Sequence, residues 1–412
     1  MKKPTIYLVF SVVLLVFSAC EQEEVGQMPK FQEVAGAVSS TIPASSWQSG
    51  SISSIVPPDE LEDLGGQLEG TNIWKSNNPE IFRGTGWLMQ NSRTDASRGG
   101  SATPMSGTFP IYLFHINKTG SQKYVHVLVT NPNSSTITIS GKGSMYNNAE
   151  KPLTGSGTGQ SFHVAKDWIN NNPRTSFSNV SLGQYQAYEV AKLPVSNNGM
   201  IDGRFEVTAS QGVYVYTVVT SGGSFTDAVN KSQGGPAAGD IYSPGTNAYG
   251  REAGVYDESV WKGTTNLPLP ASTSHLGLAL NTSSKFAVNG VYLQNQNADD
   301  VMRLSDSADK TYGNYGHKYD ITLAFTNPHS TSKTVSVYFG SNYTNSVNTP
   351  SFTYNGPVLM NGVTKNVYTT PTSPRQWLAT WTVPAGGAFN GNFDFYVPGL
   401  ITTGQQLVLV VN

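Results

Sequence analysis

Residues 125–140 read Val-His-Val-Leu-Val-Thr-Asn-Pro-Asn-Ser-Ser-Thr-Ile-Thr-Ile-Ser, and this stretch decides the predicted fold. Residues 321–336 read Ile-Thr-Leu-Ala-Phe-Thr-Asn-Pro-His-Ser-Thr-Ser-Lys-Thr-Val-Ser and align with it without a gap, placing Asn131 on Asn327. Each copy has an apolar run, an Asn-Pro break and an alternating run of strand-forming residues. Because an Asn before a proline disfavours helix and starts a turn, each copy is predicted to be a β-hairpin.

A second pair of similar blocks follows in the same order. Residues 203–207 (Gly-Arg-Phe-Glu-Val) precede an apolar strand at 213–219, and residues 391–395 (Gly-Asn-Phe-Asp-Phe) precede one at 407–411. The alternative is a chance likeness between strands rich in Thr and Val. We predict an all-β fold with two related antiparallel β-sandwich (Ig-like) domains that arose from an internal duplication, and very little helix.

The composition is typical of a secreted β-protein. Only 13% of the 412 residues are charged, while Gly (42) and Tyr (20) are abundant. These residues suit turns and strands, respectively. The net charge is −2 and no basic stripe is present, so nucleic-acid binding has no electrostatic basis. The predicted segments are a lipoprotein signal peptide at 1–19, a flexible polar tether at 20–57, a first β-sandwich domain at 58–222, a Gly/Pro-rich connector at 223–275 and a second β-sandwich domain at 276–412.

Cys20 is the single cysteine of the chain and follows a segment that reads as a secretion signal. Two lysines precede an apolar run at 6–17, which is shorter than the ~20 residues that cross a bilayer as a helix. The sequence Phe17-Ser18-Ala19-Cys20 resembles a bacterial lipobox, so Cys20 is predicted to be lipidated and to bind the membrane through its acyl chains. This places the protein in the bacterial cell envelope, at the outer membrane or cell surface. Ordinary cleavage and release is the alternative.

Several further segments are shared with a known family. They include residues 66–69, 76–80, 109–115 and 250–255, and the most specific is Gly313-Asn314-Tyr315-Gly316-His317-Lys318-Tyr319, directly before the second repeat. These segments resemble a bacterial, largely cyanobacterial family of secreted proteins known as a domain of unknown function, over about residues 65–412. The resemblance implies export and a fold, with no assigned activity. Ile116 follows His115 where the family often has a second histidine, so the resemblance does not imply a paired-histidine metal site here.

Residues that could carry chemistry are sparse. The six histidines have no zinc-protease spacing, and no Gly-x-Ser-x-Gly nucleophile elbow is present. The densest acidic cluster is Asp299, Asp300, Asp306 and Asp309. Because calcium takes roughly six to eight oxygen ligands, this loop is a candidate calcium site, although its spacing does not match the EF-hand. A solvated loop is the alternative, and no other cofactor is predicted.

Seven tryptophans suggest a second kind of site. Trp377 and Trp381 lie four residues apart in a predicted strand, and alternation would place both on one face, where they could stack on sugar rings. Packing in the core is the alternative. We predict a non-enzymatic, lipid-anchored cell-envelope protein that serves as a structural or interaction module, with a surface protein or a glycan as its partner. The alternatives are a glycan-binding module that uses exposed aromatics and a glycoside hydrolase with paired carboxylates.

Overall fold

The computed structural model describes residues 38–92, 98, 100–240, 251–285, 287–288, 290–341, 352–401 and 404–412, which all belong to one compact unit. The chain over these ranges is mostly β-sheet, as predicted, and has two α-helices, α1 (Gln160–Ile169) and α2 (Phe225–Gln233). Two short 3-10 turns, η1 (Ala44–Ser46) and η2 (Pro58–Glu60), complete the helical elements. No helix within the described ranges is long and apolar enough to cross a membrane.

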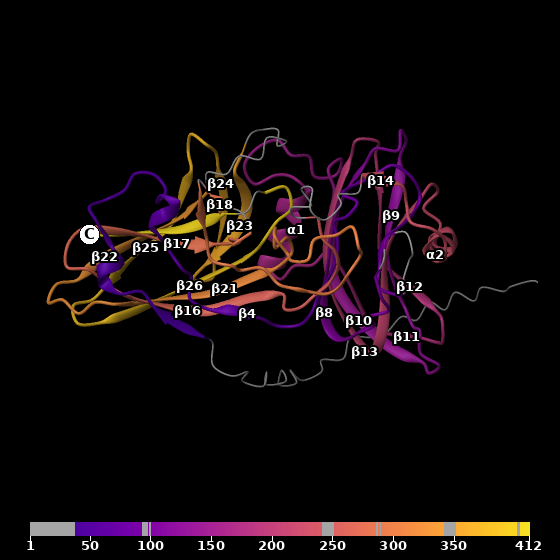
Figure 1. The fold of residues 1–412 in the computed structure, drawn as a ribbon, viewed down its shortest axis with the longest axis horizontal. Helices are drawn as coiled ribbons and strands as arrows, with labels where there is room; N and C mark the ends of the chain where they lie inside the picture. Colours follow the sequence, from indigo (N-terminus) through magenta and orange to yellow (C-terminus); the bar gives the residue numbers. More distant parts are fainter. Residues whose placement is uncertain are drawn as a thin grey trace, which may run out of the picture. The chain divides into compact units, whose positions relative to one another are not determined.

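The second half of the fold, built from the later part of the chain and from four short strands within residues 39–69, consists of two sheets that enclose one apolar core (Figure 1). The seven-stranded sheet consists of β1 (Ser39–Thr41), β4 (Gln67–Glu69), β16 (Val260–Pro268), β21 (Lys318–Thr326), β23 (Tyr354–Met360), β24 (Val363–Thr369) and β26 (Ala388–Tyr396). The six-stranded sheet consists of β2 (Gln48–Ser49), β3 (Leu61–Glu62), β17 (Ser274–Leu280), β22 (Lys333–Gly340), β25 (Arg375–Val383) and β27 (Gln405–Val411). Alternating residues of β21 and β22 point into the core between them, which is the pattern expected of strands with one buried face.

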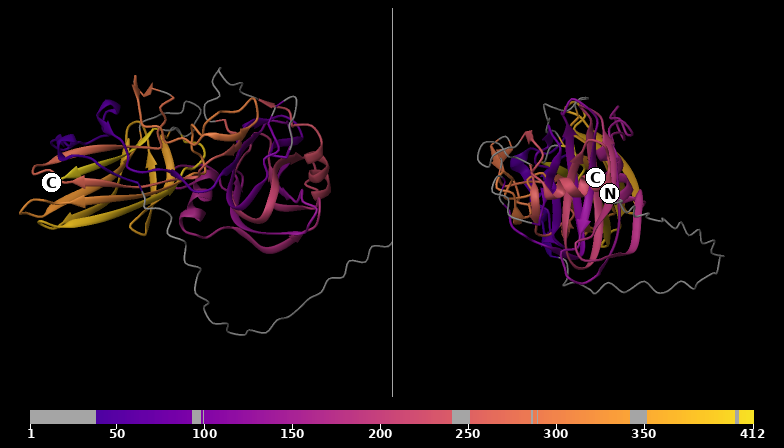
Figure 2. Two further views of the ribbon diagram at one scale, coloured as in Figure 1. Left: turned by 60° about the horizontal axis from the view of Figure 1, so that its bottom comes forward. Right: turned by 90° about the vertical axis from the view of Figure 1, so that its right-hand side faces the viewer.

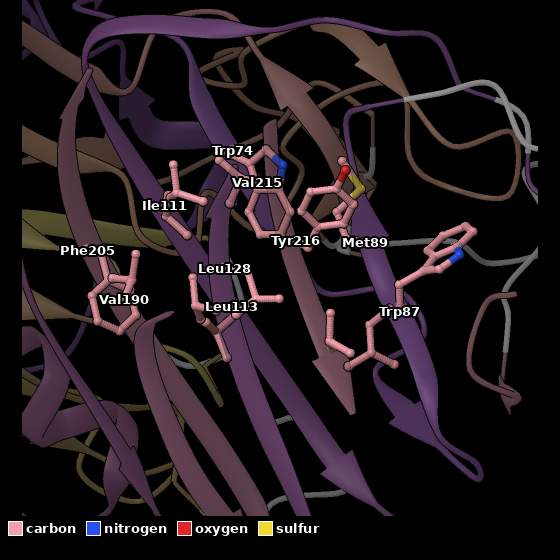
Figure 3. Packing of buried hydrophobic residues seen from close by; sticks show 14 of the residues in the cluster. Trp74, Trp87, Met89, Ile111, Leu113, Leu128, Val190, Phe205, Val215 and Tyr216 are labelled. Carbon is pink, nitrogen blue, oxygen red and sulfur yellow. The ribbon is translucent and has the colours of Figure 1, made fainter. Parts of the chain in front are cut away.

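The first half of the fold, which also includes two strands at 253–256 and 300–303, is a twelve-stranded sheet that folds over a second core. Its strands are β5 (Ile73–Ser76), β6 (Ile81–Phe82), β7 (Gly86–Gln90), β8 (Met105–Asn117), β9 (Lys123–Thr130), β10 (Ile137–Asn147), β11 (Thr175–Leu182), β12 (Ala187–Val195), β13 (Met200–Thr220), β14 (Gly239–Asp240), β15 (Ala253–Tyr256) and β20 (Asp300–Arg303). The long strand β13 belongs to both layers, because its first half pairs with β8 and β10 and its second half pairs with β7 and β9. Trp74, Ile111, Leu113, Phe205 and Val215 are fully buried between these layers (Figure 3). A separate short hairpin joins β18 (Ala287–Val288) and β19 (Val291–Tyr292).

The segment expected to be a tether is shorter than predicted. Residues 39–41 pair with β16, residues 48–49 pair with β17, and the Trp47 side chain is buried in the core of the second half. Figure 2 shows this N-terminal part beside the C-terminal strands. The polar composition of the segment hid these few apolar anchors, so the expected boundary at residue 57 lies too far along the chain.

The expected connector at 223–275 is also largely structured. It contains α2, β15, β16 and the start of β17. Strand β16 runs parallel to β21, and β5 runs parallel to β8, so the sheets are mixed and not purely antiparallel as predicted. A parallel pair needs a long connection, and the chain between these paired strands supplies one.

The same strand pairing occurs twice. In the first half β8 pairs with the start of β13, while β9 pairs with β12 and the end of β13. In the second half β21 pairs with β26, while β22 pairs with β25 and β27. The registers match: Ile116 lies opposite Met200 as Thr326 lies opposite Ala388. The ladders also skip one residue at corresponding places, Val190 in β12 and Leu378 in β25.

In each half the chain passes from one sheet layer to the other at a buried asparagine. The Asn117 amide Nδ2 donates to the carbonyls of Ser121 (2.8 Å) and Val195 (2.8 Å). The Asn327 amide Nδ2 donates to the carbonyls of Thr331 (2.9 Å) and Val383 (3.1 Å). The two asparagines therefore occupy equivalent places, each at the end of the strand that pairs with β13 or β26.

This equivalence corrects the predicted repeat alignment, which placed Asn131 on Asn327. Asn131 caps a third turn of the same kind, because its Nδ2 donates to the carbonyls of Ser135 (2.8 Å) and Leu182 (2.9 Å). The similar local sequence thus matched a turn one strand too far along. The predicted hairpins are also wrong, since β9 does not pair with β10, and β21 does not pair with β22. At each turn the asparagine side-chain amide donates hydrogen bonds to backbone carbonyls that no partner strand bonds.

Candidate functional site

The motif Gly313–Tyr319 forms a tight turn that leads into β21. Asn314 has a φ of 49° and Gly316 a φ of 80°, a left-handed conformation that asparagine and glycine adopt most readily. The Asn314 amide Nδ2 donates to the carbonyl of Gln296 (2.9 Å) and to Oδ1 of Asn281 (3.1 Å). The turn is therefore fixed from within by a buried side chain.

Gly316 brings this turn against the first half of the chain. A Cβ at Gly316 would lie 2.7 Å from the ring of Tyr112 in β8, so this close approach requires glycine. The ring of Tyr112 also stacks on that of Tyr315, with centroids 6.3 Å apart and planes 24° apart. The motif is thus where β21 of the second half meets β8 of the first.

Arg204 on β13 reaches from the first half into the second. Its Nε donates to the carbonyl of Gly316 at 2.8 Å. Its guanidinium carbon lies 4.2 Å from the ring centroid of Trp168 in α1 and 4.5 Å from that of Tyr396 in β26. Trp168 in turn donates from Nε1 to the Arg204 carbonyl at 3.0 Å. One cation therefore bridges the two halves between two aromatic rings.

Asp202 lies two residues before Arg204 on the same face of β13. Its Oδ2 accepts a hydrogen bond from the Tyr112 hydroxyl at 3.4 Å. Gly399 of the second half lies so close that a Cβ there would be 2.3 Å from this oxygen. Burial raises the pKa of Asp202 to about 7, and hydrogen bonds from Tyr112 and the Gly399 amide offset part of that rise.

This buried carboxyl makes stability depend on pH. The folded state keeps the Asp202 proton that the unfolded state releases near pH 4, so the free energy of unfolding is expected to fall as pH rises from about 4 through about 7. The contribution of one proton is at most roughly 1.4 kcal/mol per pH unit. Chemical denaturation of wild type and Asp202→Asn across this range measures it as the difference between the two slopes. Identical pH profiles for the two proteins would contradict the burial of this carboxyl at the contact.

Three further buried polar residues lie at this contact. Lys75, Glu252 and His317 are at most 1% exposed. Burial lowers the pKa of Lys75 to about 8, with Glu252 opposing the change, and burial lowers the pKa of His317 well below its usual value, with Lys75 and Arg204 adding to the effect. The Glu252 Oε1 atom accepts from the backbone N–H of Gly313 at 3.3 Å, which ties the motif to the residues just before β15.

We call this cluster the joint: Lys75, Tyr112, Asp202, Arg204, Glu252 and the motif 313–319. Its polar side chains are buried, and its histidine is neutral near pH 7 because burial lowers the pKa of His317. Tyr112, Arg204 and Glu252 make hydrogen bonds in the joint, whereas Lys75 Nζ, Asp202 Oδ1 and both ring nitrogens of His317 are buried without a hydrogen-bond partner in the described part of the chain.

Comparison with family models decides the relationship of the chain. A model described as "Protein of unknown function (DUF3370)" matches residues 59–158 and 228–359. The chain belongs to the DUF3370 family. The motif 313–319 lies within the second matched segment, as the resemblance in the sequence predicted.

No curated protein matches this DUF3370 chain. Among solved structures, it is similar at 6% identity to an anti-sigma factor domain-containing protein (TM-score 0.15, covering 73% of this chain and 78% of that one). It is also similar at 6% identity to the CUB1-EGF-CUB2 domains of rat MASP-1 (TM-score 0.17, 82% and 99% covered). A tandem CBM22 domain from Paenibacillus barcinonensis Xyn10C is 9% identical (TM-score 0.15, 85% and 91% covered). These scores are too low to carry an argument.

The candidate calcium residues of this DUF3370 protein do not form one site. Asp306 is paired with Arg98 (Oδ2 to Nε, 2.7 Å), and Asp309 accepts from the Tyr312 hydroxyl (2.7 Å). Asp299 pairs with Lys310 and Asp300 lies 3.5 Å from Arg303. Within the described ranges no three His, Cys, Asp or Glu side chains are grouped to hold a metal ion. These carboxylates are turned toward nearby cations and a phenol, which spacing in the sequence could not reveal.

The two candidate glycan-binding tryptophans lie on different faces. Leu378 is the extra residue of the bulge in β25, so the alternation of side chains shifts between Trp377 and Trp381. Trp377 is 49% exposed, whereas Trp381 packs on Phe325 and Phe389. The other five tryptophans are buried. The expectation of a shared face is therefore wrong.

The remaining predictions fall at different places. His126 is a buried residue of β9, and its ring nitrogens contact Glu189 and Thr220. Cys20 lies outside the described residues.

Sequence reasoning missed Lys75, Asp202 and Arg204, because a charged residue inside a strand gives no local sign of a distant partner. Glu252 lies in the segment 250–255 already shared with the family, and that segment could have drawn attention to it.

Proposed function

We propose that this chain is a lipid-anchored cell-envelope protein that acts as a structural or interaction module and not as an enzyme. In this proposal two related β-sandwich modules, derived by internal duplication, are locked at the joint into one rigid body. The matched strand registers, with a bulge at Val190 and at Leu378, support the duplication. The observation that carries the rigid-body proposal is Arg204, which is held between Trp168 of one module and Tyr396 of the other.

The anchoring proposal rests on Phe17-Ser18-Ala19-Cys20. Several acyl chains hold a protein on a membrane far more firmly than one, since each buried methylene contributes about 0.8 kcal/mol. Strands β1, β2 and β3, near the start of the described residues, pair with strands of the two sheets of the second module. A chain anchored at Cys20 would therefore enter the fold through hydrogen-bonded strands, which suits stable display on a surface.

Cell fractionation with a surface protease tests this proposal. Wild type is expected in the membrane fraction and is expected to be removed from intact cells by the protease, whereas Cys20→Ala is expected in the soluble fraction or the medium. Retention of Cys20→Ala on membranes would rule out lipid anchoring. Protection of wild type on intact cells, with cleavage after lysis, would place the protein inside the envelope and contradict surface display.

Glycan binding is the second candidate function, and one observation favours it. Trp377 projects from the outer face of β25 with 49% of its surface exposed, while five of the other tryptophans are buried and Trp381 packs against the core. An exposed tryptophan on a sheet face offers the flat apolar surface on which a sugar ring can lie.

A further inference from the structure

Trp377 is part of a larger surface on the outer face of β22 and β25. Tyr338 lies directly opposite it in the strand register. Val337 and Phe339, on either side of Tyr338, point into the core, so Tyr338 points outward. Two aromatic side chains thus lie side by side on a sheet face, one of them half exposed.

Each of these rings has a cation beside it. The Lys365 ammonium lies 4.9 Å from the Trp377 ring centroid, and the Arg375 guanidinium carbon lies 4.1 Å from that of Tyr338. Neither cation has a carboxylate partner in the part of the chain that the structure describes. The Arg375 Nη1 atom is buried and has no hydrogen-bond acceptor there.

Hydroxyl groups continue the same surface along the strands. The Trp377 Nε1 atom donates to Oγ1 of Thr380 at 3.0 Å, and that hydroxyl also lies 2.9 Å from Oγ of Ser336. These contacts fix the indole plane on the sheet and leave polar groups beside it. We call Ser336, Tyr338, Lys365, Arg375, Trp377 and Thr380 the aromatic platform.

We propose that the aromatic platform binds an acidic polysaccharide. The carbon–hydrogen face of a sugar ring packs on Trp377, and the carboxylates of the chain pair with Lys365 and Arg375. The charged, planar guanidinium of Arg375 suits a carboxylate better than a neutral hydroxyl. Two unpaired cations favour an anionic glycan over a neutral one, and the aromatic surface favours a sugar over an acidic peptide. This inference names a ligand for the interaction role proposed above, but binding can be measured on soluble protein without the lipid.

Binding of soluble Cys20→Ala protein to polygalacturonate, dextran and poly-glutamate tests the proposal by titration calorimetry. We expect binding to polygalacturonate, weaker by at least tenfold in added salt, with at least tenfold weaker binding to the other two polymers. Trp377→Ala and Arg375→Gln, each made in that protein, are expected to weaken polygalacturonate binding by at least tenfold. Tyr292→Ala, which removes an exposed aromatic elsewhere, is expected to bind normally. Lys365→Gln, which removes the other cation, is also expected to weaken polygalacturonate binding.

Several outcomes would overturn the proposal. They are absence of polygalacturonate binding, equal binding of poly-glutamate, or full binding by Trp377→Ala with an unchanged melting temperature. Equal binding of dextran would show that the cations do not select the ligand and would also contradict it. These results are independent of the fractionation experiment. Loss of anchoring would remove the lipoprotein role while leaving the glycan site intact, and the reverse also holds.

Discussion

Replacing Arg204 with alanine is expected to lower the free energy of unfolding by about 3–5 kcal/mol. The change removes a desolvated cation from between two rings, each contact worth up to about 2 kcal/mol, and a charged hydrogen bond to Gly316 worth about 1.5–3 kcal/mol. It also leaves the Gly316 carbonyl without this donor. Urea denaturation followed by tryptophan fluorescence measures the loss, since Trp168 itself contacts Arg204.

Arg174→Ala is the matched control for this prediction. Arg174 also stacks on an aromatic ring (Tyr146, 4.9 Å) and pairs with Glu150 at 2.7 Å, but its side chain is 39% exposed. Exposed ion pairs contribute at most about 1 kcal/mol, so its loss should be small. Arg204→Lys keeps the charge but not the planar stacking and is expected to fall between wild type and Arg204→Ala. Equal, small losses for Arg204→Ala and Arg174→Ala would contradict the importance of the joint.

Asn327→Ala is expected to destabilise the protein by about 2–4 kcal/mol, and Asn117→Ala by a similar amount. Asn327 donates to three backbone carbonyls, those of Thr331, Val383 and Pro384, at 2.9–3.1 Å. Each buried acceptor left without a donor costs about 1–3 kcal/mol before neighbouring groups or water compensate. Denaturant titration of both variants measures the two losses.

The equivalence of Asn117 and Asn327 is tested by comparing these two losses with a surface control. Asn390→Ala changes an exposed asparagine in β26 and is expected to alter stability by less than about 0.5 kcal/mol. If Asn327→Ala is as mild as this control, the amide does not hold the crossing between sheets. If only one of the two buried asparagines matters, the two turns are not equivalent.

The sequence allowed the strand content and the location of the motif to be predicted, because both are local. Alternating Val, Thr and aromatic residues in β9 and β22 identify strands without reference to their partners. The Asn-Pro turns were found for the same reason. The direction in which the chain leaves each turn was not predicted. A hairpin and a crossing between sheets have the same local residues and differ only in which distant carbonyls accept the amide hydrogen bonds.

The joint could be predicted only in part. Gly313 to Tyr319 stood out as a motif, but the partners Lys75, Asp202 and Arg204 come from other strands and follow no fixed spacing. The bulge at Leu378 was missed for the same reason, since one inserted residue shifts the alternation and places Trp377 and Trp381 on different faces, and no local sequence pattern predicts it. Contacts between residues far apart in the chain were the part that sequence reasoning could not supply.

Differential scanning calorimetry of the soluble Cys20→Ala protein tests the central claim, that the joint makes one rigid body of both halves. The expected result is a single transition whose calorimetric and van't Hoff enthalpies agree, because neither core unfolds without disrupting the joint. Two separate transitions in the Cys20→Ala protein that retains Arg204, one for each core, would contradict the account.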